Sequence, residues 1–317
     1  TLGALLGVLG AAFLLIPTFG LLLTAGVCAG MNFLCVAAAP VLGAGSVDDA
    51  PAPARPQARG VLMLLAATGL LGIGYEVLVV RVLSQVAENT VYTFAILLAV
   101  YLVGTTLGAA AYARGASGAG DPRRLRDRLL QALAATCALG TVTLAGAATM
   151  KAWVLQALGA SMAAALAAEA AIAAAAFLLP TVVMGALFSH LGTSARAAGI
   201  GFGRALGLNT LGAALAPLLF GVLLVPALGP RLALLLVAAG YLALSSRRAW
   251  RAPAQWAAAA ATVALAAWGP SLTIIDVPPG GRLLSHREGV MGAVSVVENA
   301  SGEATLHINN RQQEGSR

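Results

Sequence analysis

Two carboxylate side chains lie inside stretches that are otherwise almost wholly apolar, and they are the groups best placed to do chemistry in this chain. Glu76 lies in the run 60–85, and Glu169 lies in the alanine-rich run 153–191. Ionisable groups at membrane depth are costly and tend to face a cavity or a partner. Each glutamate is therefore a candidate for binding a cationic substrate or a proton. If both line one path, replacing either by glutamine should abolish flux.

Glu76 also has a structural interpretation. Arg81 follows five positions later, near the same helical face and close to the helix end. One alternative is a structural Glu76–Arg81 pair, and another is an Arg81 side chain that extends to the membrane interface. His190 lies near the end of an apolar run, which favours a loop or interface position.

The remaining motifs favour packing over chemistry. The sequence has no Ser/His/Asp or Cys/His nucleophilic constellation and no metal-ligand spacing, so we assign no catalytic, cofactor or metal residue to this chain. The run GIGFG at 199–203 follows an apolar helix instead of a strand, which favours a flexible helix entry over a phosphate loop. Gly104 and Gly108, like Gly3 and Gly7, have the small-xxx-small spacing of closely packed membrane helices.

The composition is that of a multi-pass protein in the cell (inner or plasma) membrane, with the lipid bilayer as its partner. Of the 317 residues, 59% are hydrophobic and only 10% are charged, whereas soluble domains are about 25% charged. The formal charge of +7 comes with arginine clusters at 123–128 and 247–251, in short segments between apolar runs. This is the positive-inside pattern, and it argues against nucleic acid as a partner.

The apolar runs predict an all-α polytopic membrane domain of about eight to nine helices. We expect a basic loop at 114–128, a small-residue loop at 192–204, and a short interfacial helix followed by a span within 153–191, with Pro180 kinking or restarting the helix. The other expected helices cover residues 2–16, 21–39, 60–85, 91–113, 129–150, 206–225, 232–244 and 254–268.

The chain contains part of itself twice. Residues 1–20 align without a gap with residues 210–229, so that Pro17 matches Pro226 and Gly20 matches Gly229. Such repeats are typical of duplicated transmembrane halves. We therefore interpret 1–42 as the last two helices of a first half, 43–59 as a Pro/Ala-rich linker, and 60–269 as the second half. If the halves are equal, roughly 140 further residues are expected upstream.

Residues 270–317 change from helical to alternating periodicity. The segments 293–297 and 305–308 alternate on either side of the turn composition at 298–303, which predicts a β-hairpin. We also expect an earlier strand at 272–277. A hairpin alone is marginal in water, so this segment is expected to be the truncated start of a soluble domain. Whether 254–268 crosses the membrane, and so on which side that domain lies, stays open.

Six segments together resemble bacterial membrane proteins in which transporter-like helices are fused to a spermidine-synthase-like (polyamine aminopropyltransferase) domain. They are GYEVLVVRVL at 74–83, VYTFAILLAVYLVGTTLG at 91–108, LPTVVMGALF at 179–188, LNTLGA at 208–213, REGVMGAVSVVE at 287–298 and LHINNRQQEG at 306–315. The resemblance implies a region of two six-helix halves, similar to major-facilitator transporters, followed by a synthase domain.

In that family, decarboxylated S-adenosylmethionine donates an aminopropyl group to putrescine in polyamine biosynthesis. The resemblance implies that Gln313 borders the amine site and that the catalytic acids and cofactor loop lie beyond residue 317, so this fragment should not itself be active. The pair Asn309-Asn310 replaces the family's usual Asp-Gly, and Gly292-Ala293 replaces Tyr-Gln. These departures keep two other functions open: a polyamine or small-cation transporter, and a membrane anchor for a non-catalytic synthase-like domain.

Overall fold

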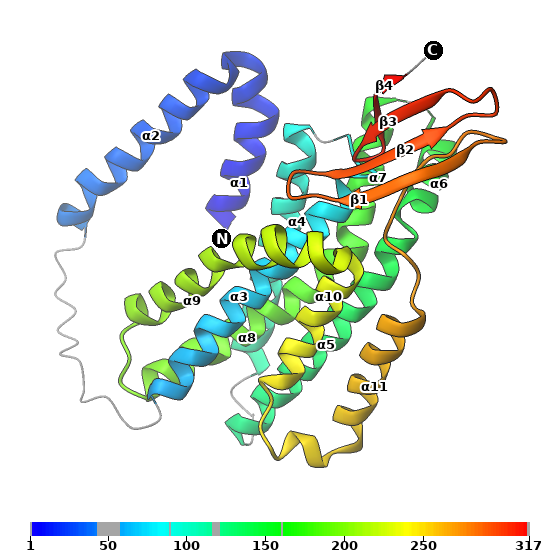
Figure 1. The fold of residues 1–317 in the computed structure, drawn as a ribbon. Coiled ribbons are helices and arrows are strands. Elements are labelled where there is room, and N and C mark those ends of the chain that lie inside the picture. Colours follow the sequence, from blue (N-terminus) through cyan, green and yellow to red (C-terminus); the bar gives the residue numbers. More distant parts are fainter. Residues whose placement is uncertain (1, 43–57, 89, 116–120, 160, 316–317) are drawn as a thin grey trace.

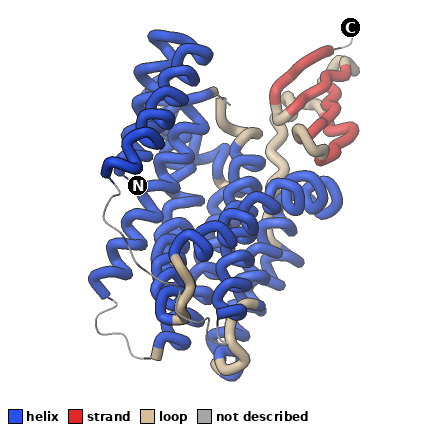
Figure 2. The backbone as a smooth tube through the Cα atoms, turned by 90° about the vertical axis from the view of Figure 1, so that its left-hand side faces the viewer, coloured by secondary structure: helices blue, strands red, loops and turns tan. Residues whose placement is uncertain are grey.

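The computed structural model describes residues 2–42, 58–88, 90–115, 121–159 and 161–315. It is mostly helical, with a small sheet at one end (Figures 1 and 2). The expected linker at 43–59 therefore lies almost wholly outside the described residues.

The helices form six continuous runs, within the described residues, that are long and apolar enough to cross a membrane. Three of these runs contain a π-helical turn, at Ala11–Leu15, Ala174–Leu178 and Pro217–Leu224. This is the architecture of a multi-pass membrane protein. The helices are α1 (Leu2–Gly10), α2 (Ile16–Leu42), α3 (Ala58–Leu83), α4 (Val91–Gly115), α5 (Pro122–Ala145), α6 (Ala147–Leu158), α7 (Met162–Ala173), α8 (Leu179–Ala197), α9 (Phe202–Ala216), α10 (Val225–Ala243) and α11 (Pro253–Trp268).

Glycines bring two pairs of helices into close contact. Gly212 of α9 lies directly against the Ala66 backbone of α3, and Gly108 of α4 lies against the Val182 backbone of α8. A Cβ atom at either glycine would overlap the facing backbone, so only glycine allows this approach. The packing predicted for Gly104 and Gly108 is thus confirmed. Gly3 and Gly7 differ, because a Cβ atom added at either one would meet no described atom of another segment within 4 Å.

The two copies of the repeat share a local geometry. The π-helical turns end at the equivalent residues Leu15 and Leu224. The helix then breaks at Gly20 (φ 73°) and at its counterpart Gly229 (φ 78°). Positive φ values are readily adopted by glycine, so both copies bend at the same place. Their surroundings differ: α10 packs inside the bundle, whereas α2 runs away from it (Figure 1).

Two predicted loops in the helical region are shorter than expected. The expected basic loop is wrong in its second half, because Asp121 caps a helix that begins at Pro122 and carries the arginines on its first turns. The expected loop at 192–204 is also too long, since α8 continues to Ala197. A short helix followed by a span is confirmed by α6 and by the continuous α7–α8 run, but α6 begins at Ala147, earlier than the predicted residue 153.

A buried tyrosine ties α3 to the α7–α8 run. Tyr75 is completely buried, and its hydroxyl donates a hydrogen bond of 2.8 Å to the carbonyl of Ala176, inside the π-helical turn. A π-helical turn disrupts the regular backbone bonding of an α-helix, and here one of its carbonyls accepts a bond from another helix. This bond fixes the part of α3 that also carries Glu76.

The C-terminal strands form one antiparallel sheet in the order β1 (Arg282–Glu288), β2 (Ala293–Glu298), β3 (Ala304–Ile308) and β4 (Arg311–Gly315). The predicted hairpin is confirmed as β2–β3, with Val297 opposite Thr305. Asn309 (φ 49°) and Asn310 (φ 62°) form the two-residue connection from β3 to β4. Two consecutive positive φ values are what a type I′ hairpin turn requires, and asparagine tolerates them.

The strand predicted at 272–277 is wrong. This segment has no strand partner; instead, the side chain of Gln85 receives a 3.0 Å hydrogen bond from the Ile274 amide and donates to the Leu272 carbonyl. A side chain at the end of α3 thus replaces the missing strand neighbour. The strand that pairs with the hairpin is β1, later in the chain.

The sheet and the arginine-rich segments lie at opposite ends of the helical region. Helix α3 begins near the arginine-rich end, and its last turn reaches the sheet (Figure 1). Helix α11 begins just after the 247–251 cluster, and the Arg231 guanidinium of α10 donates to the carbonyls of Ala266 and Gly269 at its other end. The chain therefore passes from the arginine-rich end to the sheet end before the strands begin.

Candidate functional site

Glu169 holds the connection between α3 and α4. Only 5% of the residue is exposed. One carboxylate oxygen accepts a 2.6 Å hydrogen bond from the Glu88 backbone amide, and the other accepts a 2.8 Å bond from the Thr93 hydroxyl. Both oxygens are thus engaged, so the arrangement is that of a structural acceptor that stabilises a helix connection.

Glu76 has a different environment. It is half-buried on α3 and makes no hydrogen bond or ion pair with any residue in the described part of the chain. The structural pair with Arg81 is wrong, because Arg81 points to the sheet instead. Nothing among the described residues links Glu76 to Glu169, so the structure gives no direct contact between the two predicted cation ligands.

Arg81 fastens β1 to the end of α3. Its guanidinium donates 2.8 Å hydrogen bonds to the carboxylate of Glu288 and to the carbonyl of Gly289. The two charged side chains are only 10% and 9% exposed. His286 lies on the same strand, with its Nε2 atom 3.5 Å from the second oxygen of Glu288. Removing one partner of such a buried ion pair strongly destabilises the fold, because the other charge is left buried and unpaired.

A second charged contact joins β4 to the helices. The carboxylate of Glu88 accepts a 2.8 Å bond from Lys151 of α6 and a 3.1 Å bond from Arg311 of β4. The hydrogen bond from Lys151, followed by the positive charges of Lys151 and Arg311, lowers the pKa of Glu88. Arg311 also donates to the Ala87 carbonyl at 2.8 Å. Together with Gln85, these groups give the sheet region three attachment points on the helical region.

Gln313, predicted to border an amine site, lies in β4. Its side chain is outside the described residues. Near it in the sequence, Asn310 accepts a 2.7 Å bond from the Asp276 amide and Asn309 accepts a 3.0 Å bond from the Ala293 amide. Asn309 and Asn310 therefore hold neighbouring segments of the sheet region together.

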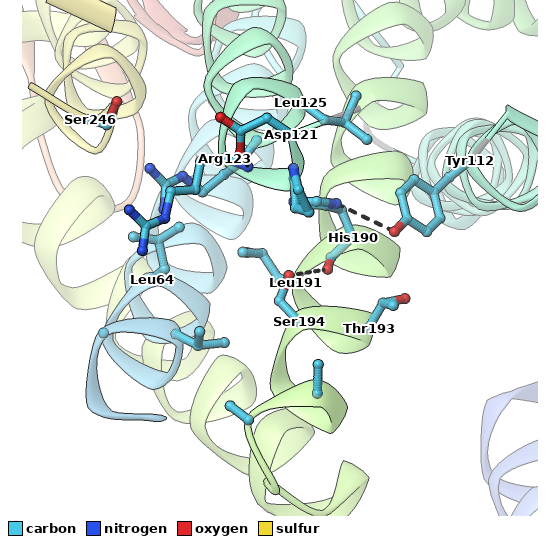
Figure 3. Close-up of a pocket in the computed structure, with 16 residues that line it drawn as sticks. Leu64, Tyr112, Asp121, Arg123, Leu125, His190, Leu191, Thr193, Ser194 and Ser246 are labelled. Carbon is cyan, nitrogen blue, oxygen red and sulfur yellow. Dashed lines mark hydrogen bonds between the residues drawn. The ribbon is translucent and has the colours of Figure 1, made fainter. Parts of the chain in front are cut away.

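A cavity of about 830 Å³ lies at the opposite, arginine-rich end. The start of α3 contributes Val61 and Leu64, α5 contributes Arg123 and Arg126, and α8 contributes His190. Figure 3 shows Leu64, Arg123 and His190 in this lining. Ligand pockets typically have volumes of about 300–1,000 Å³ and combine apolar walls with a few polar groups. By size and lining, the cavity is a candidate binding site.

His190 is part of this cavity wall; the loop position that was one of its two predicted alternatives is wrong, and the interface position stays a prediction. It lies within α8 and is only 4% exposed. Its Nδ1 atom is 3.3 Å from the hydroxyl of Tyr112, and the ring also interacts with the Pro122 backbone. Its position links the ends of α4, α5 and α8 around the cavity.

The sequence interpretation missed most of the groups that join the two regions. Gln85, Glu88 and Lys151 are polar residues next to apolar runs, which is a weak signal shared with ordinary helix ends. Arg81 was noted, but its partner Glu288 lies more than two hundred residues later, and no local spacing indicates such a contact. The cavity likewise depends on the approach of helices far apart in the sequence.

Known proteins offer no further guide to this site. No protein-family model, no curated protein and no solved structure matches the chain.

Proposed function

We propose that the chain acts as a membrane platform that holds an extramembrane β domain in a fixed position, and that this domain is of the spermidine-synthase-like type. The observation that carries the platform function is the attachment of the sheet region at three points: Arg81–Glu288, Gln85 with the 272–274 backbone, and the Glu88–Arg311 contact. A domain joined only by a tether needs no buried ion pair.

The distribution of arginines supports one orientation for this platform. Cytoplasmic segments of membrane proteins carry an excess of lysine and arginine, and the arginine clusters lie at the end remote from the sheet. The arginine-rich end therefore faces the cytoplasm of the cell (inner or plasma) membrane, and the sheet lies on the other side. In this orientation α11 brings the chain across to the sheet side.

The activity that we propose is aminopropyl transfer from decarboxylated S-adenosylmethionine to putrescine, in polyamine biosynthesis. It is supported by the six resembling segments and by Gln313 in β4. The test is transfer of a labelled aminopropyl group to putrescine by the full-length protein in nanodiscs. Labelled spermidine supports the enzyme; its absence, with the sheet still docked, leaves the platform as an anchor.

Docking itself is tested separately from turnover. Arg81→Ala should release the sheet from α3 while the bilayer-embedded helices remain folded, and hydrogen exchange should increase across β1 and β2. Arg282→Ala is the matched control, because its partner Glu298 lies within the sheet and Arg282 is 74% exposed. Equal exchange in the two variants would contradict a function based on docking.

A second candidate function is transport of a polyamine or another small cation. It is favoured by one observation: Glu76 is a carboxylate in a membrane span with no hydrogen bond or ion pair to the described residues. Such a group is free to take a cationic ligand. In proteoliposomes, Glu76→Gln should abolish putrescine uptake, whereas Asp276→Asn, outside the spans, should retain it. Uptake unchanged by Glu76→Gln, or no uptake by the unmodified protein, rejects this candidate.

A further inference from the structure

The cavity at the arginine-rich end is built from two different kinds of surface. Apolar side chains come from Val61 and Leu64 of α3, Leu125 of α5 and Leu191 of α8. Guanidinium groups come from Arg123 and Arg126 on the first turns of α5; Figure 3 shows Arg123 together with Ser194 of α8 in the lining. A ligand that fits both surfaces has an anionic group and an apolar part.

The charges around the cavity leave one arginine free. Arg126 is held by Asp127, with 3.0 Å and 3.2 Å bonds to one carboxylate oxygen. Asp127 is also bound by Ser246. The Arg123 guanidinium, in contrast, makes no hydrogen bond or ion pair with any residue that the structure describes.

The one carboxylate in the cavity lining is already compensated. Asp121 accepts a 3.0 Å bond from the Arg123 amide, which caps α5. Its other oxygen lies 3.9 Å from Arg124 and 4.0 Å from Arg248. Asp121 therefore supports the arginines and does not attract a cation into the cavity, so the local charge favours an anion.

The polar groups on the α8 side are held in fixed positions. The Tyr112 hydroxyl and the Pro122 backbone fix the ring of His190, and the Ser194 hydroxyl donates to the His190 carbonyl at 2.9 Å. These contacts keep the α8 wall in place opposite the start of α5. A site held in position before binding loses less conformational entropy when a ligand enters.

We propose that this cavity binds a phosphate-bearing amphiphile. Arg123 is the main ligand of the phosphate, Arg126 is the second, and Val61 and Leu64 contact the apolar part of the amphiphile. Guanidinium groups pair with phosphate through two parallel hydrogen bonds. Two sources offer this chemistry: the headgroup of an anionic lipid from the adjacent leaflet, and a soluble organic phosphate. The proposal is independent of the platform function at the other end of the molecule.

The test compares Arg123→Gln with Arg128→Gln in the full chain. Arg128 lies on the same helix and is exposed, but it does not line the cavity. Native mass spectrometry and thermal shift in detergent would use short-chain phosphatidylglycerol, phosphatidylcholine and hexyl phosphate as probes. A charge-assisted hydrogen bond contributes enough for its loss to weaken affinity by about tenfold.

The expected result is saturable binding of phosphatidylglycerol or hexyl phosphate, but not phosphatidylcholine, that is weakened about tenfold by Arg123→Gln and not by Arg128→Gln. Preference for phosphatidylglycerol identifies a lipid site, and preference for hexyl phosphate identifies a soluble ligand. Val61→Phe, which fills the apolar side, should weaken both. Equal losses in the two arginine variants, or no saturable binding of either anion, would overturn the proposal.

Discussion

The two ends of the helical region use charge in different ways. At the sheet end, Arg81 is buried against Glu288, and Glu88 is shared by Lys151 and Arg311. At the arginine-rich end, most guanidinium groups are exposed, and Arg123 has no partner among the described residues. Paired, buried charge fixes one protein segment against another, whereas unpaired charge is available to lipid or ligand.

This difference assigns separate tasks to the two ends. The sheet end is built for a permanent contact within the chain, since its ion pair is desolvated and its partners come from distant segments. Under our proposals, the arginine-rich end binds an anionic amphiphile and sets the orientation of the helices. Variants that exchange or remove these charges should therefore have effects of different size and kind at each end.

The largest effect is expected at the buried ion pair. Glu288→Ala leaves Arg81 as an uncompensated buried charge, which costs about 3–5 kcal/mol, so protection of the β1 and β2 amides from hydrogen exchange should fall sharply. Replacing both partners, as Arg81→Met with Glu288→Leu, should recover most of that protection because no charge is left unpaired. If the double variant exchanges as fast as the single one, the lost protection comes from the missing ion pair itself and not from an unpaired charge.

A smaller effect is expected at Gln85. The residue is only 4% exposed, and Gln85→Ala leaves the Ile274 amide without its acceptor, at a cost of about 1–3 kcal/mol. Limited proteolysis of the 270–281 segment should become faster. Gln156→Ala, an exposed glutamine on α6, is the control and should cleave at the rate of the unmodified protein. Unchanged cleavage in Gln85→Ala would show that the segment is held by other contacts.

The smallest effect is expected at Glu88. Because the pKa of Glu88 is lowered in the folded protein, its contacts contribute fully above the unfolded pKa and are lost as the pH falls through the lower folded pKa. Glu88 is 38% exposed, so solvent screens the contribution to at most about 1 kcal/mol.

Protection of the β4 and α6 amides, calculated relative to their intrinsic exchange rate at each pH, measures this contribution as the pH falls. The acid-induced loss of protection should disappear in Glu88→Gln, and about 1 M salt should reduce it. The Arg81–Glu288 contact should be little affected by the same salt, because it is buried. An equal salt response at both contacts would remove the distinction between buried and exposed charge at this end.

The general architecture follows from local sequence. Long apolar runs predicted the membrane helices, and the alternation around residues 293–308 predicted the β2–β3 hairpin. The repeat predicted equivalent positions, and the structure gives Gly20 and Gly229 the same backbone geometry. Local backbone conformation depends mainly on the residues of the same segment, so the sequence of each segment is enough to predict these features.

The contacts that distinguish the two ends are not encoded locally. Gly3 and Gly212 are equivalent in the repeat, yet only Gly212 packs against another helix. Glu76 and Glu169 are similar by sequence, yet only Glu169 has two hydrogen-bond donors on its carboxylate. In each case the difference comes from a segment far away in the chain, which no spacing rule reveals.

Placement of the two ends on opposite sides of the membrane is tested most directly by cysteine labelling in spheroplasts. The exposed Cys28 and Cys35 are first replaced by serine, and Ser301→Cys in the β2–β3 turn is compared with Arg128→Cys on α5. A membrane-impermeant maleimide should label Ser301→Cys in intact spheroplasts and Arg128→Cys only after permeabilisation. Labelling of both positions before permeabilisation, or of Arg128→Cys alone, would contradict the proposed orientation.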